Sequence, residues 1–356
     1  MPQTFASLGL TAALACGGCA GATVPPRAAD HAPRTCAPDG QPVDARSVAE
    51  RLGYPADARL LILHADDVGM THSTNVATLH ALEAGLIQSA SILVTSPWLP
   101  EVADWARQHP DQDLGIHLAL TSEWPPYRFR PVSGAHAVPS LVDPLGYLPQ
   151  TQAEVEARAT PEEVQRELSA QIELAHAPGI TITHLDSHML ALFWKRELFA
   201  AYVDVGTHYG IPMLVPEQKV VRHHNLELSA QLRLVDQIIG ITPDVPHSEW
   251  RNWYERTLSQ LGPGVYEALL HLSADDAEMQ AVTANIDGWG AAFRARDLAV
   301  VSDPGFQAFL KTQGFRLVNW RQLARALPQG CRGPLGIRVP DSDRCHSDST
   351  NEACRP

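Results

Sequence analysis

Leu60-Leu61-Ile62-Leu63-His64-Ala65-Asp66-Asp67-Val68-Gly69 is an apolar run that carries two adjacent carboxylates and stops at a glycine. This pattern is typical of a buried strand that brings charge to its carboxyl end. Neighbouring side chains of a strand point to opposite faces, so Asp66 and Asp67 can serve one site only where the strand ends and the backbone turns. A metal or a proton must then offset their repulsion. We therefore expect one acid to bind a metal and the other to accept a proton.

Two later segments combine an apolar strand with histidine. Residues 113–120 form a run with His117 inside it, and residues 180–188 form a run that ends in a second cluster of polar residues. The carboxyl ends of parallel strands converge on one rim of an α/β fold, where sites are built. One aspartate and two histidines that leave positions open are a recurrent hydrolytic or redox metal arrangement. Taken singly, paired aspartates are commonly a solvated turn, and a lone histidine in a strand is commonly a core residue.

Strand and helix alternate between about residues 57 and 326. Strands are expected over residues 60–65, 90–95, 114–120, 180–185, 212–215, 264–271 and 315–318, and helices over residues 73–84, 100–108, 161–175, 195–208, 226–239 and 286–296. This alternation predicts a parallel sheet, and about seven strands predict a single TIM-like (β/α) barrel. Residues 121–150 are too long for an ordinary connection and are expected to pass over the rim as a functional excursion.

Composition limits the classes of partner. With 356 residues, 45% of them hydrophobic, the chain can bury the core of one barrel-sized domain or of two smaller ones, and we favour one. The 27 basic and 40 acidic residues give a formal charge of -13. This charge argues against nucleic acid or an anionic membrane surface as a partner. A neutral or cationic ligand is easier to accommodate.

The first 23 residues are expected to be a targeting segment. The apolar run from Leu8 to Cys16 is too short to span a bilayer and is typical of a secretory signal, although no Lys or Arg precedes it. A disordered start or a misassigned initiation site is the alternative. Residues before Cys16 and Cys19 also resemble lipoprotein cleavage sites. We expect an exported protein, periplasmic or lipid-anchored to a bacterial membrane, with residues 24–56 as an N-terminal extension.

The remaining cysteines lie outside the expected barrel, in the N-terminal extension and in the irregular tail of residues 327–356. They are Cys36, Cys331, Cys345 and Cys354. Four cysteines in the tails suit disulfides in an oxidising compartment, with a pairing that the sequence leaves open. A structural zinc site is the less favoured alternative, because no Cys-x-x-Cys spacing occurs after the signal segment.

Three motifs together resemble those of the YdjC-like family of carbohydrate deacetylases. They are His64-Ala65-Asp66-Asp67-Val68-Gly69-Met70 with Asn75, Gly115-Ile116-His117-Leu118-Ala119-Leu120-Thr121, and Thr183-His184-Leu185-Asp186-Ser187-His188. That family includes chitooligosaccharide deacetylases and proteins associated with hopanoid biosynthesis. The resemblance covers roughly residues 59–323. It implies a β/α barrel related to polysaccharide deacetylases that removes acetyl groups from N-acetylated sugars with a divalent metal.

Matched motif by motif, the resemblance implies that Asp67, His117 and His188 bind the metal and that Asp66 is the general base. The segment ending at His271 looks like the family's late Gly-Val-x-Glu stretch with its histidine, which makes His271 the candidate general acid. Magnesium or zinc is the expected metal, and manganese, cobalt or nickel also fits the ligand set. A metal-activated water would be the nucleophile.

The chain departs from the family pattern at three places. The family usually has asparagine where His64 stands, further histidines where Met189 to Ala191 stand, and Pro-Gly where Leu272-Ser273 stands. The ligand positions are intact, so these departures concern substrate choice and the identity of the acid. We expect His184 and Asp186 to orient the ligands by hydrogen bonds, and direct coordination in a rearranged site is the alternative.

Substrate contacts are expected from the excursion and from the residues after the fourth strand. Aromatic rings could stack on sugar faces, and two arginines could meet an acidic substituent; packing of the loop is the competing interpretation. These residues are Trp124, Tyr127, Phe129, Trp194, Arg128 and Arg130.

Two other functions remain alternatives. One is a non-catalytic carbohydrate-binding lipoprotein on the same fold, against which Asp66 argues because binding alone requires no base. The other is a hydrolase of another amide, an ester or a lipid-linked sugar. The sequence indicates no oligomeric state.

Overall fold

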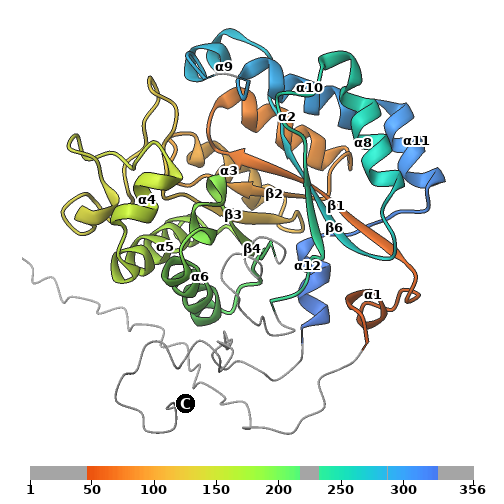
Figure 1. Cartoon of the computed structure of the whole chain (residues 1–356), viewed down its shortest axis with the longest axis horizontal. Helices are drawn as coiled ribbons and strands as arrows, with labels where there is room; N and C mark the ends of the chain where they lie inside the picture. The colour runs from red at the N-terminus through yellow and green to blue at the C-terminus, as the bar shows by residue number, and fades with distance from the viewer. Residues whose placement is uncertain (1–45, 217–231, 287, 328–356) are drawn as a thin grey trace, which may run out of the picture. The chain divides into compact units, whose positions relative to one another are not determined.

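The computed structural model describes residues 46–216, 232–286 and 288–327 (Figure 1). The expected signal segment, most of the N-terminal extension and all six cysteines lie outside these residues. The export, lipidation and disulfides expected of them therefore stay predictions. Within the described ranges, none of the helices has the length and apolar character that a membrane span requires.

A seven-stranded parallel sheet forms the centre of the described chain. Its strands are β1 (Arg59–Val68), β2 (Ser89–Ile92), β3 (Leu114–Leu118), β4 (Ile182–Ser187), β5 (Gln237–Gly240), β6 (Gly264–His271) and β7 (Arg316–Leu317). The order is β4-β3-β2-β1-β6-β5, and β7 pairs with β1. The predicted α/β fold with about seven parallel strands is confirmed. Among the described residues the hydrogen-bonded order ends at β4 and β5, so closure of a barrel stays a prediction.

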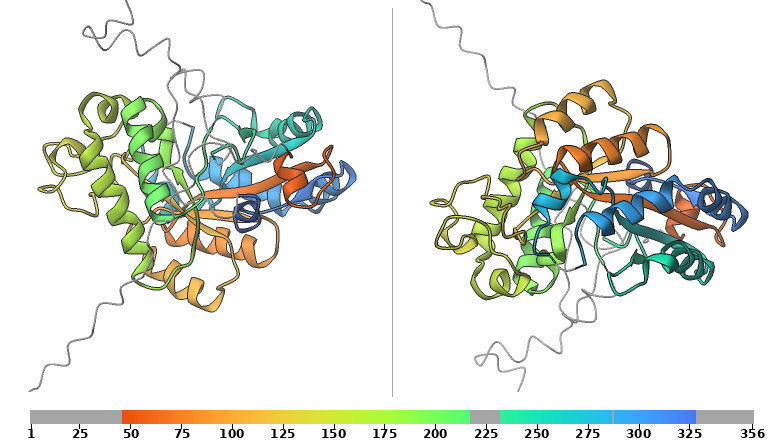
Figure 2. Two further views of the ribbon diagram at one scale, coloured as in Figure 1. Left: turned by 90° about the horizontal axis from the view of Figure 1, so that it is seen from below. Right: turned by 90° about the horizontal axis from the view of Figure 1, so that it is seen from above.

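Helices precede, connect and follow the strands. They are α1 (Val48–Arg51), α2 (His72–Glu83), α3 (Leu99–Gln108), α4 (Gln152–Arg158), α5 (Pro161–His176), α6 (Arg196–Tyr209), α8 (Trp250–Ser259), α9 (Ala277–Val282), α10 (Ala291–Ser302), α11 (Pro304–Thr312) and α12 (Trp320–Leu323). Figure 2 shows α5 and α6 packed together on one flank, and α8, α10 and α11 gathered on another. Helix α5, which was expected over residues 161–175, begins with proline in its first turn and buries Val164, Leu168 and Ile172.

Several predicted elements are wrong or displaced. Residues 237–239 of the predicted helix 226–239 belong to strand β5, and residues 226–231 lie outside the described chain. The apolar spacing there favours a helix, but pairing with β6 selects the strand. Predicted strand 212–215 contributes one bridge, from Met213 to Leu185. The predicted helix 286–296 begins only at Ala291, while α1, α4, α8, α9, α11 and α12 were not predicted.

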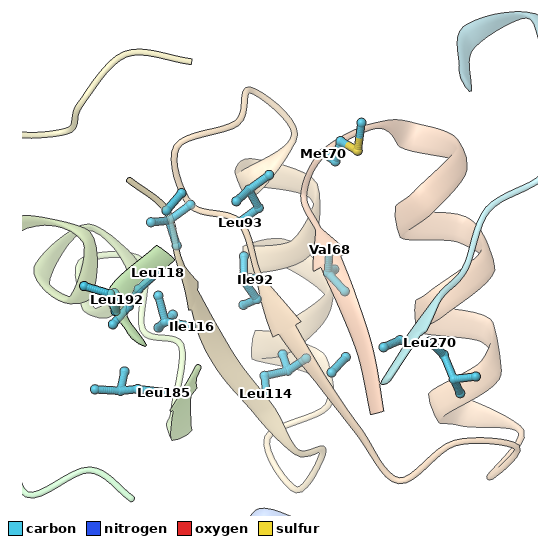
Figure 3. Packing of buried hydrophobic residues seen from close by; sticks show 14 of the residues in the cluster. Val68, Met70, Ile92, Leu93, Leu114, Ile116, Leu118, Leu185, Leu192 and Leu270 are labelled. Atoms are coloured by element: carbon cyan, nitrogen blue, oxygen red, sulfur yellow. The ribbon is translucent and has the colours of Figure 1, made fainter. Parts of the chain in front are cut away.

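Strand β1 is buried on both faces, which explains its continuous apolar sequence. Leu61, Leu63 and Ala65 pack in the larger hydrophobic cluster, whereas Leu60 and Ile62 pack in a smaller one. Figure 3 shows part of the larger cluster, to which neighbouring strands contribute side chains. By strand alternation, His64 and Asp66 continue the face of Leu60 and Ile62.

Candidate active site

The end of β1 brings both aspartates to one side of the sheet. Its pairing with β2 shifts register between Ala65 and Val68, and Asp67 has a left-handed backbone with φ 66°. A bulged, left-handed turn re-aims the second carboxylate, which regular alternation would send to the opposite face. Gly69 follows with φ 93°, and its N–H donates to Asn75 Oδ1 at 2.6 Å. This is the turn that the sequence requires after two acidic residues.

Asp67, His117 and His188 meet at the carboxyl end of the sheet. Asp67 Oδ1 lies 3.5 Å from His117 Nε2 and 3.3 Å from His188 Nδ1, and the two ring nitrogens are 3.1 Å apart. All three residues are buried. The structure therefore brings the three expected ligand residues together from β1, β3 and the end of β4.

The geometry of this cluster fits a divalent cation. Ligand atoms about 2.0–2.2 Å from one cation lie about 3.0–3.5 Å from one another in octahedral or tetrahedral coordination, which matches the three separations. Asp67 Oδ1 is also buried without a hydrogen-bond partner in the described chain. A buried carboxylate oxygen that faces two imidazoles and accepts no hydrogen bond is the oxygen that a cation would satisfy.

Carboxylates on the far side of both imidazoles set which ring nitrogen faces the cluster. Asp186 Oδ1 lies 2.7 Å from His117 Nδ1, and Glu123 Oε2 lies 2.9 Å from His188 Nε2. When each outer nitrogen donates to its carboxylate, the inner nitrogen keeps its lone pair for a metal. Asp186 thus makes the orienting contact expected from the sequence. Glu123 was not predicted; its only signal is its place in the excursion just after β3.

Arg294 on α10 also belongs to this site and was not predicted. Its Nη2 donates to Asp67 Oδ2 at 2.7 Å, and the side chain is buried. Burial alone would raise the pKa of Asp67. Arg294 and the two imidazoles outweigh burial and hold this pKa well below its usual range. Likewise, Glu123 and Asp67 outweigh burial and raise the pKa of His188 to about 10, so a cation that binds Nδ1 would have to replace a proton there. No sequence signal connects Arg294 with β1, because the two are far apart along the chain.

Asp66 lies beside the cluster and His271 borders the same cavity. Asp66 Oδ2 is 3.9 Å from His117 Nε2, and Oδ1 is 3.1 Å from His64 Nε2. Asp66 and His271 are register partners across β1 and β6. Burial, with a contribution from Arg294, lowers the pKa of His271 to about 4, so the ring is neutral near pH 7. His271 packs against Trp289 and Phe293.

His184 is not part of the cluster of Asp67, His117 and His188. Its Nδ1 is 3.0 Å from the Thr183 hydroxyl, and its Nε2 is 4.0 Å from Asp186 Oδ2. The ring stacks on Trp320 with centroids 4.9 Å apart. His184 therefore contacts Asp186, which in turn holds His117.

A cavity of about 500 Å³ opens above the cluster. Its walls are largely apolar and aromatic. The described wall and rim residues include Trp124, Met189, Leu190, Leu214, Leu269, Ile286 and Trp289. Met189 and Leu190 both adopt left-handed backbone conformations, with φ 51° and 56°, which turn the chain sharply after His188. Such strained turns cluster at functional sites.

Of the expected substrate residues, Trp124 lines this cavity, whereas the other five are not among its described lining residues. Tyr127 donates to the Met70 carbonyl, Arg128 donates to the Leu148 carbonyl at 2.6 Å, and Arg130 lies over the Tyr147 ring. The arginine contacts lie within the excursion, whereas the Tyr127 contact joins the excursion to the turn after β1. Phe129 packs against Trp124, and Trp194 is 39% exposed. Trp289 lines the cavity and was not predicted, since nothing in the sequence marks its loop as part of the rim.

Comparisons with known proteins identify the relatives of this chain. A family model described as YdjC-like protein matches residues 60–312. A carbohydrate deacetylase of Thermus thermophilus is 32% identical over 290 residues, which cover 78% of this chain and 98% of that protein. A carbohydrate deacetylase of Thermoanaerobacter pseudethanolicus is 26% identical over 268 residues, 74% of this chain and 98% of that protein.

One solved structure shows the same fold. It is a protein of Enterococcus faecalis described as a putative cellobiose-phosphate cleavage protein, with a TM-score of 0.63 and 23% identity. The similarity covers 75% of this chain and 99% of that one. With the family match over most of the described chain and the relative from Thermus thermophilus, these findings show that the chain belongs to the YdjC-like family.

Proposed function

We propose that this protein is a metal-dependent hydrolase that removes the acetyl group from an N-acetylated sugar or oligosaccharide. In this reaction a C–O bond forms between water and the acetyl carbonyl carbon, and the amide C–N bond breaks. Asp66 accepts the proton that water loses. The departing nitrogen gains a proton, so the products are acetate and a free amino sugar.

One observation carries the proposal: Asp67 Oδ1, His117 Nε2 and His188 Nδ1 lie within 3.5 Å of one another at a cavity that Asp66 also lines. That arrangement supports hydrolysis at a metal in general. The relatives named carbohydrate deacetylase support an acetylated carbohydrate as the substrate class.

Asp67, His117 and His188 would hold one divalent cation, which would polarise the acetyl carbonyl and lower the pKa of water. One carboxylate and two imidazoles suit zinc, manganese, cobalt and nickel, and a hard carboxylate ligand also permits magnesium. We propose magnesium or zinc. Arg294 occupies the other oxygen of Asp67, so this carboxylate would offer a single oxygen to the cation.

Asp66 is the proposed base because it borders the cavity without belonging to the ligand set. Oδ2 of Asp66 lies 3.9 Å from His117 Nε2, and the residue is 5% exposed. A carboxylate next to the cluster but outside it is free to accept a proton. A protein that only bound carbohydrate would need no such group.

His271 is the proposed proton donor to the departing nitrogen. It lines the same cavity and lies across from Asp66 on the neighbouring strand. With its pKa lowered to about 4, the ring is neutral near pH 7. To act as the acid, the ring must first gain a second proton, because the N–H of a neutral imidazole is too weakly acidic to protonate a departing nitrogen. The proton that Asp66 takes from water, passed to His271, would supply it, and that proton ends on the nitrogen as the C–N bond breaks.

Metal analysis combined with an acetate assay tests the proposal. We expect the purified protein, loaded with zinc or magnesium, to release acetate from mono- or oligosaccharides of N-acetylglucosamine, and to lose activity after chelation. His117→Ala and His188→Ala should lose both the metal and the activity. Bound metal without acetate release from any N-acetylated sugar would instead favour a hydrolase of another amide, an ester or a lipid-linked sugar. Failure to bind any divalent metal would reject the proposal.

A further inference from the structure

His64 lies between two carboxylates in the interior of the sheet. Its Nε2 is 3.1 Å from Asp66 Oδ1 and 3.2 Å from Asp186 Oδ2. The same nitrogen is 3.1 Å from the Ser91 hydroxyl, and the residue is fully buried. Two buried carboxylates this close to one atom repel each other unless a donor or a cation separates them. The His64 imidazole occupies that position.

The two carboxylates that His64 contacts have different positions in the site. Asp186 uses its other oxygen to contact His117 Nδ1 at 2.7 Å. Asp66 directs its other oxygen toward the cluster, 3.9 Å from His117 Nε2. With Oδ1 held next to His64, Oδ2 is the oxygen of Asp66 that remains to accept a proton.

Packing around His64 fixes the orientation of its ring. The His184 ring meets it edge to face, with centroids 5.0 Å apart and an interplanar angle of 76°. His184 is itself stacked on Trp320 at 4.9 Å. Opposite His184 stands Gly115, where a Cβ would lie 2.4 Å from the imidazole, so only glycine leaves room for this ring. Within this packing, His64 cannot swing away from the carboxylates.

The surrounding charge favours a cationic His64. Glu267 is fully buried on β6 and accepts a hydrogen bond from Trp320 Nε1 at 2.8 Å. Burial alone would lower the pKa of His64. The nearby carboxylates of Glu267, Asp186 and Asp66 outweigh burial and raise this pKa well above its ordinary value. The same buried group can therefore carry positive charge toward both carboxylates.

We propose that His64 is a positioning residue for the deacetylation reaction: it holds Asp66 with Oδ1 turned into the sheet, so that Oδ2 faces the metal cluster and the cavity. This inference rests on the proposed function and adds a residue that touches neither substrate nor metal. Contacts then run from Asp66 through His64 and Asp186 to His117, which links the position of the base to that of a metal ligand.

Two substitutions of His64 test the inference. His64→Leu removes the donor at similar size, whereas His64→Gln keeps an N–H donor near the place of Nε2. We expect kcat of the leucine variant to fall about 10- to 100-fold, with little change in KM or in the Kd for zinc measured by calorimetry. The glutamine variant should recover most of kcat. As a control, His109→Leu alters a histidine that stacks on Trp105 outside the cavity, and kcat should not change.

Three results would overturn the inference: an unchanged kcat in His64→Leu, a loss that His64→Gln does not restore, or a weaker Kd for zinc with normal kcat at saturating metal. Should circular dichroism show that the leucine variant does not fold, His64→Met replaces it, because methionine adapts to irregular space. Acetate release by the unaltered protein is measured first. Its absence would reject the proposed function, whereas an active protein with active apolar variants would reject only the role of His64.

Discussion

Asp186 Oδ1 lies 2.7 Å from Nδ1 of His117, and both side chains are buried. The contact holds the His117 ring with Nε2 toward Asp67 and His188. Burial alone would raise the pKa of Asp186. The His117 and His64 imidazoles outweigh burial and hold this pKa below its usual range. Asp186 therefore stays ionised, and under the proposed function it would strengthen His117 as a ligand without binding the cation itself.

Asp186→Asn should weaken metal binding. The substitution keeps the size of the side chain but removes the charge that selects the His117 tautomer, so we expect the Kd for zinc to rise about 10- to 100-fold. Isothermal titration calorimetry on the metal-free protein measures it. Asp104→Asn, at an exposed position on α3, is the control and should leave the Kd unchanged. An unchanged Kd in Asp186→Asn would contradict this role.

Asp66→Asn should abolish turnover and spare the metal. Loss of a general base typically costs about 10²- to 10⁴-fold in rate, and we expect kcat to fall by that amount. Because the proposed ligand set does not include Asp66, the Kd for zinc and KM should change little. Steady-state kinetics of acetate release, together with metal titration, check both expectations. A variant that lost its metal would show that Asp66 is a ligand instead of the base.

Local sequence signals predict the parts of the fold that local chemistry determines. The apolar run of β1, the Pro161 start of α5 and the histidine-bearing strands β3 and β4 are readable, because strand burial and helix starts leave periodic patterns. The carboxyl ends of parallel strands share one rim, so the meeting of Asp67, His117 and His188 also follows from topology. Strand β5 is not readable in this way, since its helical spacing is overruled by pairing with β6.

Side chains that reach the site from outside the strands escape this reasoning. Arg294 comes from α10 and Glu123 from the excursion, and each contacts a cluster residue only through tertiary packing. The same limit applies to substrate residues. Arg128 and Arg130 carry the chemistry expected of a binding loop, yet their contacts are within the excursion. Composition identifies the loop, but only the fold shows which of its side chains face the cavity.

Trp289→Ala should weaken substrate binding more than Trp194→Ala. The two tryptophans are similarly exposed, 40% and 39%, but only Trp289 is among the described residues that line the cavity. Its ring also packs on Phe293 with centroids 4.6 Å apart, which gives a sugar a rigid surface. An aromatic contact worth about 1.4 kcal/mol corresponds to a tenfold effect, so KM should rise about tenfold. Equal or reversed effects would place the sugar elsewhere.

Glu267 should make stability fall as pH rises. Burial, reinforced by Asp186 and Asp66 and opposed by His64, raises the pKa of Glu267 to about 8. An unfolded glutamate titrates near 4.3, about four units lower, so the folded state binds this proton more tightly. The resulting stabilisation is fully present below about pH 4 and is lost as pH rises through about 8. This loss cannot exceed about 1.4 kcal/mol per pH unit.

Glu267→Gln isolates this contribution, because glutamine keeps an acceptor for Trp320 Nε1 but does not titrate. The free energy of unfolding, from urea denaturation at pH 5.5, 7.0 and 8.5, should fall more steeply for the unaltered protein than for the variant. Groups that do not interact with Glu267 titrate equally in both proteins, so the difference between the two curves reports Glu267 together with the groups coupled to it, above all His64. Parallel curves would mean that Glu267 is already ionised at pH 5.5, with the nearby His64 imidazolium as its counter-charge.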